Sequence, residues 1–261
     1  MSKLIQRIER LGKDGPAPLG FGAASRRQPT PTMVRLASVA DPSAAKKLDG
    51  ISLDGLLFTP GTATGSTLAE AASGLKDVPW GVQVQNPTSD QVKELVGAGC
   101  DFITMTGLAA PLEALHDEEL GKLLVVSAEL KEEHAHSMEV LPVDVVLYAN
   151  AMSSPLNLES LLELAAVRGE IGIPFLVLVN GALTTWELEC LRGIGVEGVV
   201  ADLASTDVDT LKALSQRIRD LPRRRARSDS ASPSLPHVSA RAQPLQDDEG
   251  DEEPEDPDDF P

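Results

Sequence analysis

A strand–helix–strand pattern in residues 173–203 constrains the fold more than any other feature of the sequence. Residues 175–179 form an uninterrupted apolar run, and residues 199–201 repeat that character. Between the two runs, Thr184 and Glu187 are typical of a helix start, and two glycines follow as stop signals. The pattern predicts one βαβ unit of about 30 residues, with both strands buried on both faces.

The same alternation of strands and helices runs through most of the chain. The expected strands are residues 34–38, 55–58, 80–85, 102–105, 123–128, 143–148, 175–179 and 198–201. The expected helices that follow them are residues 42–48, 67–75, 91–97, 111–120, 131–138, 158–167, 186–192 and 208–220. Strands that alternate with helices form parallel sheets. Eight such units favour an α/β fold closed into a single (β/α)8 TIM barrel, with an open doubly wound sheet as the alternative.

Segments of different composition flank the expected barrel of residues 33–221. Residues 1–32 hold a helical extension followed by a connection, and the helix carries one apolar stripe that should pack on the barrel. Residues 222–261 are basic, then rich in Ser and Pro, then acidic. Such a composition buries too little apolar surface to offset its ordering entropy, so we expect a disordered acidic C-terminal tail. A solubilising role and a role in contacting a protein partner both stay open for this tail.

Charge and composition argue against several classes of function. The net charge is −17, but ten acidic residues lie between 247 and 259, so most of the acidity belongs to the tail. Aromatic residues make up only 3% of the chain, which leaves few platforms for stacking nucleobases. No apolar run approaches the roughly 18 residues of a membrane span, and the N-terminus lacks the apolar stretch of a signal peptide. We therefore expect a cytoplasmic protein that binds neither nucleic acid nor membranes.

Two segments carry a resemblance to a known superfamily. Residues 97–105 (GAGCDFITM) and 180–203 (NGALTTWELECLRGIGVEGVVADL) resemble the fourth strand and the seventh-to-eighth unit of aldolase-type TIM barrels. That superfamily includes enzymes of tryptophan and histidine biosynthesis and flavin-dependent oxidoreductases. The resemblance covers roughly residues 33–220 and implies fold more than function. In many of these relatives, the loops after the seventh and eighth strands hold a phosphate of substrate or FMN on glycine N–H groups.

The matching loops of this chain depart from the phosphate-binding pattern. They span residues 180–182 and 202–204, and only Gly181 matches the expected glycines. Asp202 lies where a phosphate would bind, and a carboxylate beside a phosphate dianion costs on the order of several kcal/mol in a partly desolvated site. A standard phosphate or FMN site is not expected, and the cofactor stays unassigned. An FMN-dependent oxidoreductase-like barrel is kept as an alternative function.

Polar residues near the strand ends predict a site for a small-molecule ligand. In residues 80–85, Trp80 and the valines must face the helices, which directs Gln83 and Gln85 into the barrel. Similar reasoning makes further polar residues converge at the C-terminal mouth. The predicted catalytic residues are Glu129 and Asp202 as acid and base and Tyr148 as a hydrogen-bond donor. The predicted ligand-binding residues are Gln83, Gln85, Asn150, Asn180 and Gly181.

Two other stretches can be interpreted either as ordinary structural segments or as functional sites. The Gly/Thr-rich residues 59–66 are typical of an ordinary connection but could also cradle an anion. The charged residues 129–136 contain metal-ligand types, yet His134 and His136 lie two apart and would not share a helix face. No metal site is expected there.

Two classes of function follow from the sequence. In the first, the barrel is an enzyme that acts on a small polar metabolite by acid/base chemistry at its C-terminal mouth. In the second, it has lost catalysis and serves as a ligand-binding or scaffold module with an acidic interaction tail. The inward polar residues favour the enzyme, whereas the missing phosphate glycines and short loops favour the module. The enzyme is favoured narrowly, with the module as the alternative, and whether the protein is an enzyme stays open at this stage.

Overall fold

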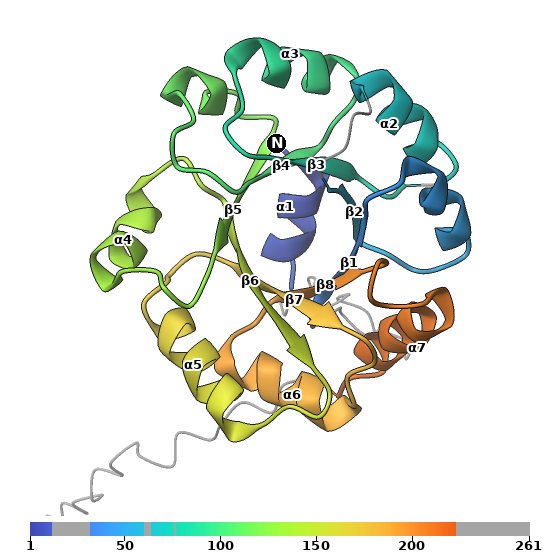
Figure 1. The fold of residues 1–261 in the computed structure, drawn as a ribbon, viewed down its shortest axis with the longest axis vertical. Coiled ribbons are helices and arrows are strands. Elements are labelled where there is room, and N and C mark those ends of the chain that lie inside the picture. The colour runs from blue at the N-terminus through green and yellow to red at the C-terminus, as the bar shows by residue number, and fades with distance from the viewer. Residues whose placement is uncertain (12–31, 60–63, 76, 223–261) are drawn as a thin grey trace, which may run out of the picture. The chain divides into compact units, whose positions relative to one another are not determined.

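Eight parallel strands close into a barrel in this computed structural model, which describes residues 1–11, 32–59, 64–75 and 77–222 (Figure 1). The strands are β1 (Val34–Val39), β2 (Gly55–Phe58), β3 (Trp80–Val84), β4 (Phe102–Met105), β5 (Gly121–Val126), β6 (Val145–Ser153), β7 (Phe175–Asn180) and β8 (Gly198–Asp202). The first and last strands pair in parallel, with Val34 opposite Gly198 and Ser38 opposite Asp202. This pairing confirms the predicted closure and rules out the open sheet.

Helices follow the strands and form an outer ring (Figure 1). The α-helices are α1 (Lys3–Glu9), α2 (Gly65–Ala72), α3 (Ser89–Gly97), α4 (Glu132–Ser137), α5 (Leu158–Gly169), α6 (Thr185–Ile194) and α7 (Val208–Arg219). The 3₁₀ helices are η1 (Pro42–Leu48), η2 (Leu112–Leu115) and η3 (Met138–Val140). No helix in these described ranges is long and apolar enough to cross a lipid bilayer.

Several predicted boundaries differ from the observed ones. The helix expected at residues 111–120 is a single 3₁₀ turn, η2, whose N-terminus begins after Pro111 without a side-chain cap. The fifth strand begins two residues earlier than predicted, and the sixth begins later and continues through an irregularity between Tyr148 and Met152. Continuous apolar runs lack the alternation that would locate such ends. The predicted C-terminal tail, most of the N-terminal connection and the centre of the Gly/Thr loop lie outside the described residues.

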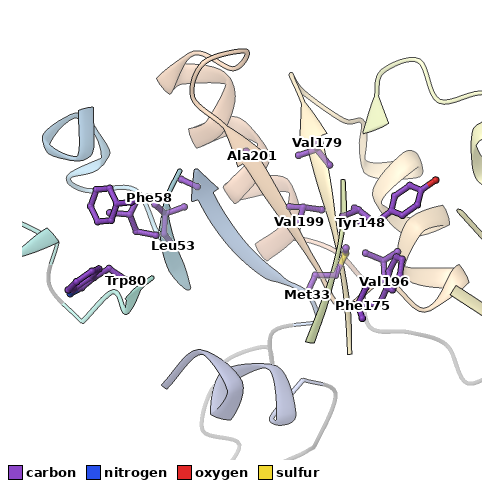
Figure 2. Close-up of a cluster of buried hydrophobic side chains, with 14 of the residues drawn as sticks. Met33, Leu53, Phe58, Trp80, Tyr148, Phe175, Val179, Val196, Val199 and Ala201 are labelled. Atoms are coloured by element: carbon purple, nitrogen blue, oxygen red, sulfur yellow. The ribbon is translucent and has the colours of Figure 1, made fainter. Parts of the chain in front are cut away.

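Helix α1 fills the N-terminal end of the barrel. Viewed along the barrel, it lies within the ring of strands (Figure 1), and from the side it lies below their starting ends (Figure 2). Leu4 is fully buried, and Ile5 and Ile8 join it in an apolar cluster with the inward-facing residues of the strands. The Asp101 carboxylate accepts hydrogen bonds from the Ser2 hydroxyl at 2.7 Å and from the backbone N–H groups of Lys3 and Leu4. These bonds satisfy N–H groups that a helix start leaves unpaired.

Two apolar layers lie on opposite faces of the sheet. The inner layer includes Leu36, Leu57 and Phe102, and the Phe102 ring occupies space that Gly81 leaves free on the neighbouring strand. A Cβ atom on Gly81 would lie 2.4 Å from that ring, so no larger residue fits there. The outer layer packs the strands against the helices and includes Phe58 and Trp80 (Figure 2). With the interior filled and α1 at one end, the C-terminal mouth is the end at which a ligand can approach.

Candidate functional site

The mouth beside β7, β8 and β1 is held together by hydrogen bonds within the chain. Asp202, at the end of β8, accepts a bond on Oδ1 from the Ser38 hydroxyl at 3.1 Å. The same oxygen accepts a bond from the backbone N–H of Ala204 at 3.2 Å. The Ser205 hydroxyl donates to Oδ1 of Asn180 at 2.8 Å. Asn180 and Asp202 therefore lie on the same side of the mouth, as the sequence predicted, and each is bonded to a neighbouring loop.

Several backbone N–H groups are already bonded in the loops after β7 and β8, where the sequence resemblance implies a phosphate site. The Gly181 N–H donates to Oγ1 of the buried Thr206 at 2.9 Å. The N–H groups of Ser205 and Thr206 donate to the backbone carbonyl of Asp202. Since the Ala204 N–H is bonded to the Asp202 carboxylate, four amide donors of these loops face acceptors of the chain itself. An incoming phosphate would have to break these bonds and meet a carboxylate.

A cavity of about 1040 Å³ lies around the end of β3, where Leu68, Val82 and Leu95 of the outer layer are among its lining residues. Gln83, Gln85 and Thr106 line it, as do Asn86 and Gln91. The side chains of Gln83, Gln85 and Thr106 form no hydrogen bond within the described part of the chain. Both glutamines line this cavity, and Gln83 is the register partner of Thr104 on the neighbouring strand. Their role in ligand binding stays a prediction.

The cavity carries negative and neutral polar groups. Asp41 and Glu94 line it, whereas none of its described lining residues is Lys, Arg or His. Hydrogen bonds from the Ser43 hydroxyl and the Ser43 backbone N–H lower the pKa of Asp41, so this carboxylate is charged at neutral pH. A ligand with an anionic group would find no countercharge in this lining.

The placement predicted for Tyr148 is wrong. Its side chain is fully buried in the outer apolar layer, where it contacts Phe175 with 6.0 Å between the ring centroids (Figure 2). Leu147, the residue before it, belongs to the inner layer instead. The apolar run of β6 shows no alternation, so the sequence did not indicate which face Tyr148 occupies. Burial raises the pKa of its hydroxyl, which has no hydrogen-bond partner within the described residues.

Glu129 follows the end of β5, Asn150 lies within β6, and neither is joined to Asp202 by a hydrogen bond. Strand β5 ends at Val126, so Glu129 lies in the following turn, where its side chain is exposed and its backbone N–H donates to Ser127. Asn150 is exposed in the irregular part of β6. The catalytic and binding roles of these residues stay predictions.

The sequence analysis missed Glu187, a buried carboxylate in the first turn of α6. It accepts bonds from the Thr184 N–H and hydroxyl, the Leu156 N–H at 2.7 Å and the Ser154 hydroxyl. Burial by itself would raise its pKa, but these hydrogen bonds together hold the pKa below its usual range. The Thr184/Glu187 capping box was recognisable in the sequence. Its bonds to the loop after β6 join positions about 30 residues apart in the sequence, and no local sequence pattern predicts such contacts.

Metal-ligand residue types do not cluster into a site within the described ranges. No group of three or more His, Cys, Asp or Glu side chains there is arranged to hold a metal ion. His136 instead lies 3.3 Å from the Glu170 carboxylate on the surface.

Solved structures show the same barrel at low sequence identity. KGPDC from Streptococcus mutans aligns with a TM-score of 0.55 at 13% identity, over 72% of this chain and 98% of that chain. A 3-hexulose-6-phosphate synthase aligns with a TM-score of 0.55 at 17% identity, over 71% and 99% of the two chains. N-(5'-phosphoribosyl)anthranilate isomerase from Pyrococcus furiosus aligns with a TM-score of 0.52 at 10% identity, over 72% and 99%.

These solved structures share the fold of this chain. The closed eight-stranded parallel barrel is a (β/α)8 TIM barrel, as the sequence predicted. No family model and no curated protein matches the chain. At identities this low the likeness concerns the fold alone.

Proposed function

We propose that this barrel is a binding module for a small polar molecule without a phosphate group, held at the C-terminal mouth. The observation that carries the proposal is the internal bonding of the loops after β7 and β8. Four of their amide donors are paired with Thr206 and Asp202, so a phosphate of a substrate or of FMN would have to displace these bonds. The nearby cavity offers amide and hydroxyl groups instead. Both features favour a neutral or cationic ligand.

Calorimetric titration of the full chain with matched ligands tests this proposal. D-ribose 5-phosphate and D-ribose share one sugar and differ in the phosphate group, and FMN and riboflavin form a second such pair. We expect the phosphate to add no affinity in either pair. An affinity for D-ribose 5-phosphate or FMN at least tenfold above that of its unphosphorylated partner would overturn the proposal, because only a phosphate site gives that difference.

Catalysis by Asp202 is a second candidate function, and one observation favours it. Its Oδ1 atom holds Ser38 and Ala204, while its Oδ2 atom accepts no hydrogen bond from any described residue and is available as a general base. Glu129 remains a proposed partner acid, although its exposed side chain is not joined to Asp202. Tyr148, buried in the outer layer, is no longer proposed as a donor.

Replacing the carboxylate distinguishes the two candidates. If the protein is a catalyst, Asp202→Asn abolishes turnover of any compound that the wild type converts, while ligand affinity falls by less than tenfold. If the protein is a binding module, the wild type converts nothing in an untargeted metabolite incubation followed by mass spectrometry. Product formation that depends on Asp202 would refute the binding module and support the enzyme.

A further inference from the structure

The cavity around the end of β3 has an apolar wall formed by Leu68 of α2, Val82 of β3 and Leu95 of α3. All three side chains belong to the outer apolar layer between the helices and the sheet. The start of α2 packs closely on α3 here, because a Cβ atom on Gly65 would lie 3.2 Å from the Ala98 side chain. With a volume of about 1040 Å³, the cavity has room for a small molecule that covers this wall with an apolar part.

Two carboxylates line the same cavity from different elements. Asp41 precedes η1, and Glu94 lies in α3 directly before Leu95 of the apolar wall. The Asp41 carboxylate accepts two hydrogen bonds from Ser43, whereas the Glu94 carboxylate forms no hydrogen bond or ion pair with any described residue. Glu94 therefore keeps its full capacity to accept hydrogen bonds from a ligand beside the apolar wall.

The charge of the cavity is not balanced by its own lining. No described lining residue is Lys, Arg or His. Hydrogen bonds from Ser43 and, to a smaller extent, the charge of Lys47 lower the pKa of Asp41, but Lys47 forms no ion pair with it in the described part of the chain. Two negative groups on one cavity repel an anion and attract a cation.

We propose that this cavity binds an organic cation, an alkylammonium compound whose charged group lies at Glu94 and whose chain lies on the apolar wall. An ammonium group only donates hydrogen bonds and a carboxylate only accepts them, so the two groups match without an unpaired atom. The apolar chain gains from leaving water for the wall. The proposal rests on the proposed function and deepens it, because it selects the cation among the neutral and cationic ligands that the function allows.

Matched probes separate the charge from the apolar chain. n-Pentylamine, 1-pentanol and pentanoate share one alkyl chain and carry a cationic, a neutral and an anionic group, while ethylamine keeps the ammonium group on a shorter chain. NMR titration of the full chain at neutral pH measures each affinity. We expect n-pentylamine to bind about fivefold more tightly than 1-pentanol, near the upper end for a partly exposed charge pair. Ethylamine and pentanoate should bind more weakly than n-pentylamine.

The chain offers a matched pair of variants for the same titrations. Glu94→Gln keeps the size of the side chain and removes its charge. Glu163→Gln makes the same change on α5, at an exposed glutamate that also forms no hydrogen bond with a described residue and does not line the cavity. Both variants should keep the melting temperature to within about 2 °C, as surface substitutions usually do. Glu94→Gln should weaken n-pentylamine about fivefold and change 1-pentanol by less than about twofold, whereas Glu163→Gln should leave both unchanged.

The outcomes separate the cation site from the proposed function. Equal affinities for n-pentylamine and 1-pentanol, or a higher affinity for pentanoate, would overturn the cation site, and so would n-pentylamine binding that Glu94→Gln leaves unchanged. The cation site also fails if n-pentylamine does not bind at about 10 mM, since that is weaker than a specific site. The proposed function survives each of these results, because it requires only a ligand without a phosphate group. Binding of D-ribose 5-phosphate at least tenfold tighter than that of D-ribose would overturn the proposed function, whatever the amine does.

Discussion

Leu4→Ala removes the side chain through which α1 enters the barrel, and we expect it to lower the free energy of unfolding by about 3 kcal/mol. Leu4 is fully buried in the inner apolar layer beside Leu36. The substitution deletes three carbon atoms, worth about 2.4 kcal/mol at roughly 0.8 kcal/mol each. The cavity left behind adds to this, because strands on all sides limit collapse. In a domain of this size, 3 kcal/mol corresponds to a fall of about 6–12 °C in melting temperature.

Thermal unfolding followed by circular dichroism measures this effect, with Lys3→Ala as the matched control. Lys3 is exposed on the same helix, and its contact with Asp101 uses the backbone N–H, which alanine retains. The control should shift the melting temperature by less than about 2 °C, as surface substitutions usually do. If Leu4→Ala shifts it no more than the control, α1 does not occupy the barrel end in solution and our account of the closed N-terminal end is refuted.

Three further predictions concern acid stability, the β8 carboxylate and the tail. Because the folded-state pKa of Glu187 is lowered, its charged form stabilises the fold above its unfolded pKa, and this stabilisation is lost as pH falls through the folded pKa. Glu187→Gln should therefore lower the free energy of unfolding at pH 7. It should also make that free energy depend less on pH below 4.5, the ordinary pKa of glutamate. Urea denaturation at several pH values measures both effects, and a pH profile equal to that of the wild type would contradict the prediction. Asp202→Asn should change the free energy of unfolding by less than about 2 kcal/mol, since the amide oxygen can still accept from Ser38; a larger loss would make Asp202 purely structural. A chain that ends at Leu221 should keep its melting temperature within a few degrees, as expected from the composition of the removed residues, and a large fall would mean that they contribute to the fold.

The barrel itself was predictable because its signals are local and repeated. Most βα units carry an apolar run and a capping residue, and Asp41, Asn157 and Asp207 each bond the start of a helix. Closure followed from the number of units, and the β1–β8 pairing confirmed it. Errors of two residues at strand ends did not affect the fold prediction, because a strand buried on both faces is apolar throughout and is recognised wherever its ends are placed.

Errors of the same size did affect the predicted site residues, because a shift of one residue along a strand moves a side chain to the other face of the sheet. In β3, the alternation of large apolar residues with Gln83 gave the sequence a clear basis for predicting the face of that residue. In β6, Tyr148 belongs to an apolar run without a polar face. Its hydroxyl group was the reason for predicting that the side chain lies at the C-terminal mouth. Glu129 was expected directly after a strand ending at residue 128, but the strand ends at Val126. The buried Thr104 hydroxyl, which has no hydrogen-bond partner among the described residues, was overlooked because no sequence pattern indicates such a group.

The two walls of the mouth differ in a way that bears on both candidate functions. Ser38 and Asp202 join β1 to β8, strands at opposite ends of the barrel sequence, and the Leu203 N–H also bonds the Ser38 carbonyl. Asp202 therefore stabilises the closure of the barrel whatever else it does. A ligand in the cavity around the end of β3 reaches the free Asp202 oxygen only if it extends from β3 to β8. A compact ligand in that cavity would be bound without being converted, whereas an extended one would place its far end beside a carboxylate able to act as a base. The length of the ligand thus decides between the binding module and the enzyme.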